Sequence, residues 1–374
     1  MDANLPAKTH TAIGLMSGTS MDGIDLALIK TDGMSFIKQG PWASRSYTPA
    51  QRDILRQALD EAVELANRNL RPGVLAAAEV MITAAHAEIV SEFLAAGHMQ
   101  AADIDVVGFH GQTVLHRPDE RLTVQLGDGQ ALAQMLKIPV VYDMRAADIA
   151  AGGQGAPLVP VFHQALVNAA KLDGPVAVVN LGGVGNITFI DGDNDPIAFD
   201  TGPGNALIDD EMRLRFGVDY DEDGRIGGSG QVNQPALAAM MAHPYFGAPL
   251  PKSLDRNAFN REPVATLSNE EAIATLTAFT AESLRAATKL LPKPPVLWVV
   301  AGGGALNPTL IAMIANRIQA KVVIADDLGW PAQLMEAQAW AYLAVRSLRG
   351  LPLTFPTTTG VLMPMTGGVI SNPK

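Results

Sequence analysis

The sequence contains no cysteine among its 374 residues. That absence excludes disulfide bonds, zinc sites built on thiolates and cysteine nucleophiles. Basic residues are also scarce: 27 lysines and arginines stand against 38 aspartates and glutamates, a formal net charge of −11. General nucleic-acid binding needs a basic surface, so no nucleic-acid partner is expected. An anionic ligand such as ATP stays open, because backbone N–H groups and a metal ion can offset the overall charge locally.

Long apolar runs are missing as well. No uninterrupted apolar stretch reaches the ~18 residues of a membrane helix, and the first ten residues lack the charged and apolar regions of a signal peptide. With 48% hydrophobic and 17% charged residues, the composition is typical of a globular protein with a large core. We therefore expect a soluble, cytoplasmic protein with no membrane partner. The chain is long for a single core, so two lobes are expected.

Several common active-site motifs are absent too. The glycine-rich segment at 14–25 lacks the lysine of a Walker A loop, and no G-x-G-x-x-G lies between a strand and a helix. There is no G-x-S-x-G and no H-E-x-x-H, and the seven histidines show no metal-ligand spacing. These absences argue against P-loop and Rossmann nucleotide sites, serine hydrolases of the α/β class and zinc enzymes.

Two glycine-rich turns of the same design are what the sequence does contain. Residues 13–29 and 176–190 each run from an apolar strand through a turn rich in Gly, Ser, Thr or Asn into a second apolar strand. Such turns expose successive backbone N–H groups that can converge on an anion. Two of them predict two half-sites for a polyphosphate, as in a nucleotide-dependent phosphotransferase. For the first, an ordinary hairpin with an Asp22-Gly23 type I′ turn is the alternative.

The first turn also carries side chains suited to phosphate and metal. Ser17, Thr19 and Ser20 offer hydroxyls to phosphate oxygens, and Asp22 offers a carboxylate that can hold Mg²⁺ through water.

Helix and strand patterns alternate in both halves of the chain, and each half opens with one of the two hairpins. This layout predicts a duplicated α/β fold with a cleft between its lobes. The predicted lobes are residues 1–140 with 346–374, and residues 141–345. The segment 145–160 has too little periodicity for a strand and too many glycines for a stable helix, so it is expected to link them.

Local signals place several elements. N-cap residues begin four expected helices, at Thr48, Asp128, Ser268 and Asn307. One expected strand covers 106–110 and stops at Gly111. Another covers 196–200 and leads into a helix that begins at Pro203.

Asp200 is the strongest catalytic candidate. It lies where an apolar strand ends and a glycine-rich turn leads into a helix, and the carboxyl ends of strands in open α/β sheets face the ligand. A carboxylate there can take a proton from a nucleophile during phosphoryl transfer. The alternative is that Asp200 caps the following helix, although Pro203 and Asn205 allow the helix to begin later.

Three further positions are candidates. The glycines at 302–304 follow a buried strand and leave room for an adenine or ribose, or for a close strand–helix crossing. His110, at a strand end, can contact a substrate, whereas a structural role is favoured for His116. Glu336 is a single acid on a largely apolar helix, either a solvated edge residue or a deliberately placed polar group.

Seven segments together carry a resemblance: GLMSGTSMDGID (14–25), HGQT (110–113), AAGGQGAPLVP (150–160), NLGGVGNIT (180–188), FDTGPGN (199–205), AGGGALNP (301–308) and MEAQAWAYLA (335–344). They resemble the anhydro-N-acetylmuramic acid kinase family over residues 13 to about 345, and GTSMDG and FDTGPGN are the most specific. The resemblance implies a duplicated, two-lobed actin-like ATPase (ribonuclease H-like) α/β fold with a central interlobe cleft.

The resemblance also implies an activity. ATP, with Mg²⁺, would phosphorylate the 6-oxygen of 1,6-anhydro-N-acetylmuramic acid while water opens the anhydro bridge. The products would be N-acetylmuramic acid 6-phosphate and ADP, in cell-wall recycling, and a homodimer is implied. Two other functions stay open: a non-catalytic ATP switch of the chaperone or actin class, and an acyl or hexose kinase of the same superfamily.

Residues and resemblance together give the site predictions. Asp200 is implied to be the base that activates the water, and Glu336 an acid that contacts the sugar and the water. The predicted ATP-binding residues are Gly18, Thr19, Ser20, Met21, Asp22, Gly23, Ile24, Asp25, Gly182, Gly183, Asn186, Gly302, Gly303 and Gly304. The predicted sugar-binding residues are His110, Arg145, Gly152, Gly153, Gln154 and Gly155. Asp22 is the predicted metal ligand.

Overall fold

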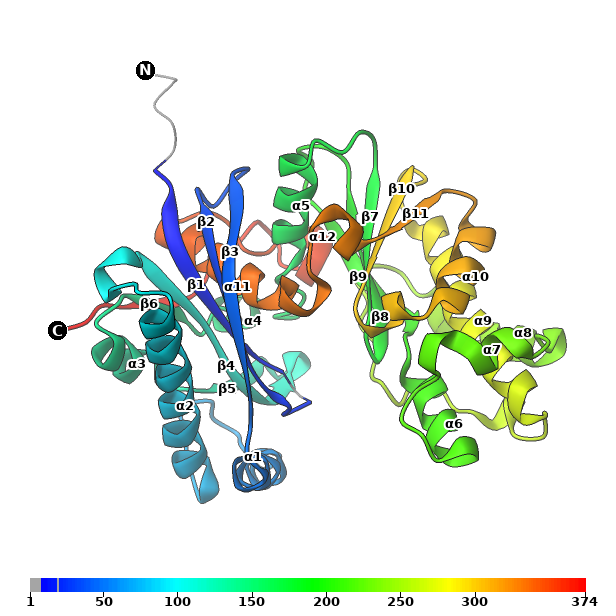
Figure 1. The fold of residues 1–374 in the computed structure, drawn as a ribbon, viewed down its shortest axis with the longest axis horizontal. Coiled ribbons are helices and arrows are strands. Elements are labelled where there is room, and N and C mark those ends of the chain that lie inside the picture. Colours follow the sequence, from blue (N-terminus) through cyan, green and yellow to red (C-terminus); the bar gives the residue numbers. More distant parts are fainter. Residues whose placement is uncertain (1–7, 19) are drawn as a thin grey trace. The chain divides into compact units, whose positions relative to one another are not determined.

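The computed structural model describes residues 8–18 and 20–374. Thr19, a predicted phosphate-binding residue, lies outside the described residues. The chain forms two compact units: the residues up to Ala170 together with Leu334–Lys374, and Lys171–Gln333. Each unit is built on one sheet with helices packed against it (Figure 1).

The first unit contains a mixed seven-stranded sheet with the order β12-β6-β4-β1-β2-β3, and β5 pairs with β4. The strands are β1 (His10–Ser17), β2 (Gly23–Thr31), β3 (Ile37–Ser46), β4 (Val106–Arg117), β5 (Leu122–Leu126), β6 (Val140–Tyr142) and β12 (Val369–Ser371). β1, β2 and β3 form an antiparallel meander. β4 lies parallel to β1, and β6 lies parallel to β4.

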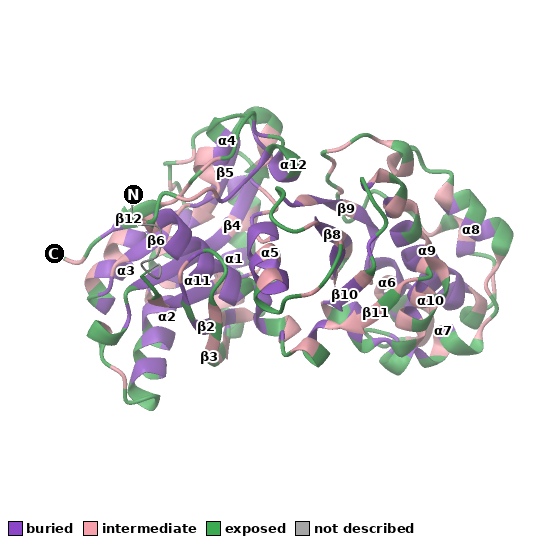
Figure 2. Ribbon diagram, turned by 90° about the horizontal axis from the view of Figure 1, so that it is seen from above, coloured by how far each residue is buried: buried purple, intermediate pink, exposed green. Residues whose placement is uncertain are grey.

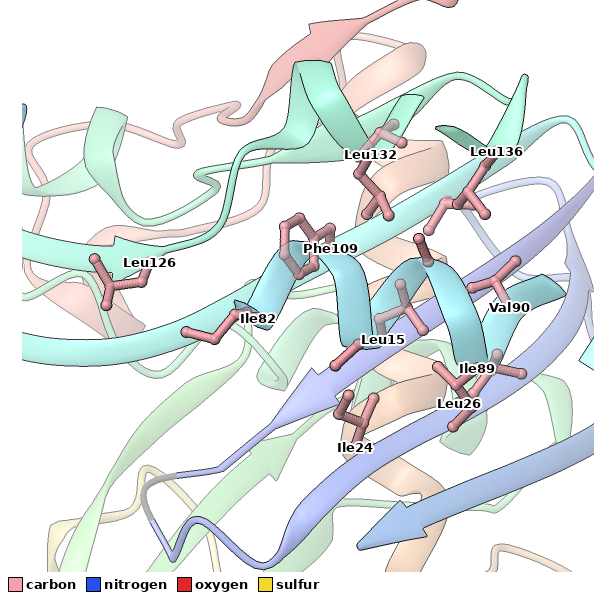
Figure 3. Close-up of a cluster of buried hydrophobic side chains, with 14 of the residues drawn as sticks. Leu15, Ile24, Leu26, Ile82, Ile89, Val90, Phe109, Leu126, Leu132 and Leu136 are labelled. Atoms are coloured by element: carbon pink, nitrogen blue, oxygen red, sulfur yellow. The ribbon is translucent and has the colours of Figure 1, made fainter. Parts of the chain in front are cut away.

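Helices pack on this sheet, with α2 and α11 on opposite faces, and the unit contains seven α-helices among the described residues. They are α1 (Pro49–Ala62), α2 (Val74–Ala96), α3 (Gly129–Leu136), α4 (Ala146–Ala150), α5 (Pro160–Ala169), α11 (Met335–Leu348) and α12 (Pro356–Thr359). Phe109 of β4 packs under α2, where its ring meets His86 at 4.8 Å between centroids. Figure 3 shows part of this core, in which Phe109 belongs to one cluster with aliphatic side chains of β1, β2, β5, α2 and α3.

α11 packs on the opposite face, directly against the backbone of two strands. Gly14 of β1 and Gly108 of β4 are lateral partners in the sheet. A Cβ atom on Gly14 would lie 1.8 Å from the carbonyl oxygen of Ala337, and one on Gly108 would lie 2.1 Å from that of Trp340. Only glycine permits this approach. Nearly the whole length of α11 is buried as a result (Figure 2).

α2 needs separate mention because of its composition. It is the one helix among the described residues that is long and apolar enough to cross a membrane, and half of its most apolar window is buried. Its buried residues belong to the core cluster that includes Phe109 and Leu132. Core helices commonly have such a composition, so it is weak evidence of a membrane span.

The second unit repeats the arrangement on a smaller scale. Its five-stranded sheet has the order β11-β10-β7-β8-β9, formed by β7 (Val176–Leu181), β8 (Val184–Ile190), β9 (Ile197–Pro203), β10 (Leu297–Ala301) and β11 (Lys321–Ile324). β7, β8 and β9 are antiparallel, and β10 and β11 continue parallel to β7. The helices are α6 (Ala206–Phe216), α7 (Arg225–Ser229), α8 (Gln234–Met241), α9 (Asn269–Ala287) and α10 (Pro308–Ile318).

The two sheets therefore share one topology: an antiparallel meander of three strands, then two parallel strands added beside the first. This is the ribonuclease H-like order of an actin-like ATPase fold. The predicted duplicated, two-lobed α/β fold is confirmed, and each unit begins its sheet with one of the two glycine-rich hairpins.

The bounds of the two units differ from those of the predicted lobes. Residues 141–170 and 334–345 belong to the first unit. The reason is pairing between distant segments: β6 joins β4, and α11 packs on β1. The segment 145–160 does not link the units either. It forms α4 and a loop whose Gln154 N–H donates to the Thr359 carbonyl at 2.8 Å, within the first unit.

Two predicted strand ends are also wrong. β4 does not stop at Gly111 but continues to Arg117, because it finds a second partner in β5. β9 continues through Pro203, so α6 begins only at Ala206.

All four N-cap predictions are confirmed. The side chains of Thr48, Asp128, Ser268 and Asn307 accept hydrogen bonds from the first turns of α1, α3, α9 and α10.

Candidate active site

The turn between β1 and β2 carries the first predicted phosphate loop. The Met21 N–H donates to the Gly18 carbonyl at 3.1 Å, and Met21 has a φ of 56°. Neither Asp22 nor Gly23 is among the described residues with positive φ. A type I′ turn requires positive φ at both of its central residues, so the alternative of an Asp22-Gly23 turn is wrong.

Side chains attach this turn to the neighbouring strand β4. The Ser17 hydroxyl donates to Gln112 Oε1 at 2.5 Å and shares a 2.9 Å hydrogen bond with the Tyr47 hydroxyl. Gln112 Nε2 donates to the Gly18 carbonyl at 3.0 Å. Ser17 is fully buried, so its hydroxyl supports the turn and is not free for a phosphate, contrary to the prediction. Ser20 and Asp22 are exposed.

His110 lies beside this network with both ring nitrogens engaged. Nδ1 donates to the Ser17 carbonyl at 3.3 Å, which leaves Nε2 to accept from the Arg145 guanidinium at 3.2–3.3 Å. Burial, and next the positive charge of Arg145, hold the pKa of His110 well below its ordinary value. The ring is therefore neutral and orients Arg145.

Arg145 is held from several sides. Its Nη1 donates to the Gly155 carbonyl at 2.9 Å, and its guanidinium carbon lies 5.2 Å from the centroid of the Trp340 ring. Burial lowers the pKa of Arg145 to about 10, and the carboxylates of Glu336 and Asp148 oppose this. At that value the guanidinium stays charged at neutral pH.

Glu336 opens α11 and faces the charge of Arg145. Solvent reaches part of its side chain. Nevertheless, loss of surrounding water raises the pKa of the Glu336 carboxyl, Arg145 lowers it, and the charge of Asp25 raises it. The first unit thus gathers the half-buried cation of Arg145 and the carboxylates of Glu336 and Asp25 close enough for their charges to interact.

The loop containing Gly152, Gly153, Gln154 and Gly155 is closed by a buried carboxylate. Asp148 Oδ1 accepts from the Gly155 N–H and Oδ2 accepts from the Thr359 hydroxyl, each at 2.6 Å. A side chain on Gly153 would collide with Asp148 and with Val361. The loop and Arg145 therefore form one hydrogen-bonded structure within the first unit.

The turn between β7 and β8 carries the second predicted phosphate loop. The carbonyls of Gly182 and Gly183 accept from the backbone N–H groups of Asn205 at 2.7 Å and Gly204 at 3.0 Å, just before α6. A Cβ atom would meet nothing closer than 3.9 Å at Gly182 and 3.7 Å at Gly183. The protein itself does not crowd these two positions, so a ligand can approach the backbone there.

The glycines after β10 pack against the end of β7 and against Asn205, on either side of this turn in the sequence. A Cβ atom on Gly302, where φ is +81°, would lie 2.3 Å from Asn180 Oδ1, and one on Gly304 would lie 2.6 Å from Leu181 Cβ. A Cβ atom on Gly303 would lie 3.3 Å from Asn205 Nδ2. The close backbone crossing proposed as one alternative is therefore present, and it brings three predicted motifs together.

Asp200 ends a row of polar residues across three strands. Asn186 is paired with Asn180 of β7 and with Asp200 of β9, so the three side chains share one face of the sheet. The register shifts between Gly185 and Asn186, which makes Thr201 the extra residue of a β-bulge. The Thr201 hydroxyl donates to the Gly185 carbonyl at 3.0 Å. Such bulges redirect a neighbouring side chain.

The carboxyl group of Asp200 is half-buried and sparsely bonded. Oδ2 accepts from the Leu254 N–H at 2.7 Å. Among the described residues, Oδ1 receives no hydrogen bond. Burial raises the pKa of Asp200 to about 6, while the Leu254 N–H and the charge of Lys252 oppose the shift. α6 has Asn205 at its N-cap, so the alternative role of Asp200 as the helix cap is wrong.

The sequence profile of the family described as "Anhydro-N-acetylmuramic acid kinase" matches residues 10–373. The chain belongs to the anhydro-N-acetylmuramic acid kinase family. The predicted resemblance is thereby confirmed, and with it membership in a family of ATP-using sugar kinases with small-molecule substrates.

Individual members of the anhydro-N-acetylmuramic acid kinase family are similar over almost their full lengths. The protein of that name from Rhodopseudomonas palustris (strain ATCC BAA-98 / CGA009) is 56% identical over 97% of this chain and 99% of its own. The one from Azorhizobium caulinodans is 56% identical over 97% and 99%.

Solved structures are more distant. The Acidaminococcus fermentans (R)-2-hydroxyglutaryl-CoA dehydratase component A covers 91% of this chain and 99% of its own at a TM-score of 0.47 and 11% identity. A ROK family glucokinase from Streptomyces griseus, in complex with glucose and AMPPNP, covers 89% and 99% at a TM-score of 0.38 and 14% identity. The fold assignment rests on the strand order described above.

Within each unit, the structure brings the predicted residues of this anhydro-N-acetylmuramic acid kinase family member together. In the first unit, His110, Arg145 and the 152–155 loop form one group with Glu336 beside it. In the second unit the glycines after β10 pack against the end of β7, next to the 182–183 turn. Sequence reasoning missed the supporting residues Gln112, Asp148 and Tyr245, because each acts through a contact distant in sequence.

Proposed function

We propose that the protein phosphorylates the 6-oxygen of 1,6-anhydro-N-acetylmuramic acid with ATP while water opens the anhydro bridge. The products are N-acetylmuramic acid 6-phosphate and ADP, and the reaction serves cell-wall recycling. Membership in the family supports the substrate and the products. The observation that carries the mechanism is Asp200, a half-buried carboxylate with a pKa near 6 and one oxygen without a partner among the described residues.

In this mechanism Asp200 is the general base. A base works best when its pKa lies near the working pH, because it is then largely ionised and still basic enough to accept a proton. Oδ1 takes one proton from water as the water oxygen bonds to the anomeric carbon. The bond between that carbon and the bridging oxygen breaks, and the bridging oxygen takes the γ-phosphoryl group as ADP leaves. The proton on Asp200 then passes to solvent.

Arg145, Glu336 and the loop at 152–155 are proposed to bind the sugar. A charged guanidinium, fixed by His110 and Gly155, suits an anionic or strongly polar substituent. Glu336 accepts hydrogen bonds from sugar hydroxyls or from the water. His110 acts through Arg145, because both of its ring nitrogens are already bonded.

The two glycine-rich turns and the glycines at 302–304 are proposed to bind ATP. Glycine positions 182 and 183 are open to a ligand, and exposed backbone N–H groups are suited to phosphate. The residues at 302–304 are proposed to lie along the adenosine.

Mg²⁺ is proposed to accompany ATP, with Asp22 as its ligand from the protein. No group of three or more His, Asp or Glu side chains arranged for a metal occurs in the described part of the chain. Mg²⁺ commonly keeps several waters and binds through substrate phosphates and one or two carboxylates, so one carboxylate from the protein is enough for the proposed site. When bound, the ion neutralises phosphate charge as the phosphoryl group transfers.

We further propose that the protein works in the cytoplasm as a homodimer. Its family membership supports this, since the resemblance implies a dimer. Analytical ultracentrifugation at micromolar concentration tests the oligomeric state, and a single species at the monomer mass would contradict it.

The activity is tested by incubating the protein with ATP, Mg²⁺ and 1,6-anhydro-N-acetylmuramic acid in H₂¹⁸O. We expect ADP and a phosphosugar in equal amounts, with ¹⁸O at the anomeric carbon and none in the phosphoryl group. Absence of phosphosugar would refute the proposal. ATP hydrolysis that no sugar accelerates would favour the switch function instead, and glucose or acetate as the better acceptor would favour a hexose or acyl kinase.

A further inference from the structure

Residues 245–254, between α8 and α9, contact Asp200 through both its backbone and its side chain. The Tyr245 hydroxyl donates to the Asp200 carbonyl at 2.6 Å. The Asp200 N–H donates to the Lys252 carbonyl at 3.3 Å. The Leu254 N–H donates to Oδ2 at 2.7 Å. This segment lies more than forty residues beyond Asp200 in the sequence, and none of the motifs includes it.

Lys252 is itself fixed within the segment. Its Nζ donates to the Tyr245 carbonyl at 3.0 Å and lies 4.3 Å from the centroid of the Tyr245 ring. Lys252 is half-buried, and burial lowers its pKa while the charge of Asp200 raises it. The effect is mutual, since the Lys252 charge lowers the pKa of Asp200. Lys252 and Tyr245 are the titratable side chains that interact with this carboxyl group.

These contacts determine which carboxylate oxygen is available. Tyr245 fixes the backbone of Asp200 beside the bulge at Thr201, where an unpaired residue weakens the ladder. The Leu254 N–H then selects one rotamer by binding Oδ2. A side chain fixed at its backbone by Tyr245 and at Oδ2 by Leu254 presents its other oxygen in a single direction, which general-base catalysis requires.

We propose that Tyr245 and Lys252 are positioning residues for Asp200, holding Oδ2 on the Leu254 N–H and leaving Oδ1 to accept the proton of the reacting water. This inference rests on the proposed function. Lys252 has a second effect: its charge keeps Asp200 ionised at lower pH than burial alone would allow.

Replacing the lysine tests the electrostatic part. With Lys252→Met, the acid limb of the kcat/KM profile is expected to move to higher pH by about half a unit or more, because the opposing charge is gone. Lys252→Arg keeps the charge and is expected to keep the limb. Lys289→Met removes one exposed lysine of the same unit that does not interact with Asp200, and is expected to leave the profile unchanged.

Replacing the tyrosine tests the positioning part. Tyr245→Phe removes only the hydroxyl, and kcat is expected to fall about tenfold, the equivalent of one hydrogen bond, with the KM for ATP and the acid limb unchanged. Tyr220→Phe, at an exposed position of the same unit, is the matched control. An equal loss in both variants, or a loss only in KM, would overturn the role of Tyr245.

A titration without turnover separates this inference from the proposed function. In protein labelled with ¹³C-aspartate, the infrared difference between wild type and Asp200→Asn reports the Asp200 carboxyl as pH varies. The band is expected to titrate at higher pH in Lys252→Met than in wild type. An unmoved band would overturn the role of Lys252 even if the enzyme is active. A shifted band in a protein that makes no phosphosugar would refute the function and leave the Asp200–Lys252 coupling in place.

Discussion

The two hairpins have the same pattern of strand pairing, each in its own sheet, but they place their acids on different strands. In each unit, one row of paired residues crosses the three antiparallel strands next to the glycine-rich turn. The row of the first unit is Met16, Asp25 and Ser44. The row of the second unit is Asn180, Asn186 and Asp200. The acid lies on the middle strand in one unit and on the third strand in the other. The same strand arrangement therefore carries its carboxylate at a different register position in each unit.

The turns are also supported in different ways. In the first unit, side chains of Ser17 and Gln112 hold the turn against β4. In the second, backbone N–H groups before α6 bind the turn carbonyls of Gly182 and Gly183 directly. A turn held by its backbone tolerates side-chain substitution nearby, whereas a turn held by a buried polar network does not. We therefore expect substitutions at Gln112 to impair the first turn more than any nearby side-chain change impairs the second.

The largest expected effect is on kcat, and it distinguishes Asp200 of the second unit from Asp25 of the first. Asp200→Asn should lower kcat by about 10²- to 10⁴-fold, because the amide cannot accept a proton, while ATP binding measured by calorimetry stays intact. Asp25→Asn should act mainly on the KM for ATP, with kcat within about tenfold of wild type. If Asp25→Asn abolishes turnover and Asp200→Asn does not, the assignment of the two acids is reversed.

The next effect concerns the cation of the first unit. Arg145→Met should raise the KM for the sugar by about 10- to 100-fold, the range expected for losing charge-assisted hydrogen bonds, with little change in the KM for ATP. Steady-state kinetics with each substrate varied in turn provides the measurement. Arg56→Met, which removes an exposed arginine on α1, is the control. An unchanged sugar KM would exclude Arg145 from the sugar site.

Two glycines of the second unit should differ in what their substitution affects: ATP binding at Gly183 and stability of the fold at Gly302. Gly183→Ala, where a Cβ meets nothing closer than 3.7 Å, should raise the KM for ATP about tenfold and change the free energy of unfolding by less than about 1 kcal/mol. Gly302→Ala should instead destabilise the fold by about 2 kcal/mol or more, from the collision with Asn180 and the positive φ. Urea unfolding and ATP kinetics distinguish the two, and a reversed pattern contradicts the ligand approach at Gly183.

The smallest effect is on stability. Because the folded pKa of Asp200, about 6, lies above its ordinary value of 3.8, ionisation costs more in the folded protein. The contribution of this group is therefore greatest below pH 4 and is lost as pH rises from 4 through 6. Asp200→Asn should melt a few degrees above wild type at pH 7.5, with the gap closing toward pH 4. Thermal unfolding across this range measures it; an equal gap at every pH would contradict a raised pKa.

Local signals in the sequence predicted several of the structural features compared here. Glycine-rich turns between apolar strands identified both hairpins, and the N-cap residues identified four helix starts. These features depend on neighbours within a few residues. Asp200 could be singled out because the sequence predicts a strand end, a glycine-rich turn and a helix start around it, although β9 continues past Asp200 to Pro203.

Contacts between distant segments could not be predicted in this way. Gly111, with a φ of +71°, resembles a strand end, yet β4 continues because β5 pairs with it. The glycines of 152–155 suggested a linker, but Asp148 and Thr359 close that loop within one unit. The support of Asp200 by Tyr245 likewise requires knowing which segment returns to the sheet.

The backbone contact of α11 with β1 has a mechanical consequence. At Gly14 no side chain separates strand from helix, and the contact lies one residue from Glu336 and three residues from Ser17. Because the α11 backbone touches the β1 backbone directly, the helix has almost no freedom to slide along the strand. Ser17 at one end of this contact and Glu336 at the other therefore move together. Ordering one end by a ligand lowers the entropic cost of ordering the other. With ATP bound beside Ser17 and the sugar beside Glu336, as proposed, we therefore expect each substrate to tighten the binding of the other by the same factor.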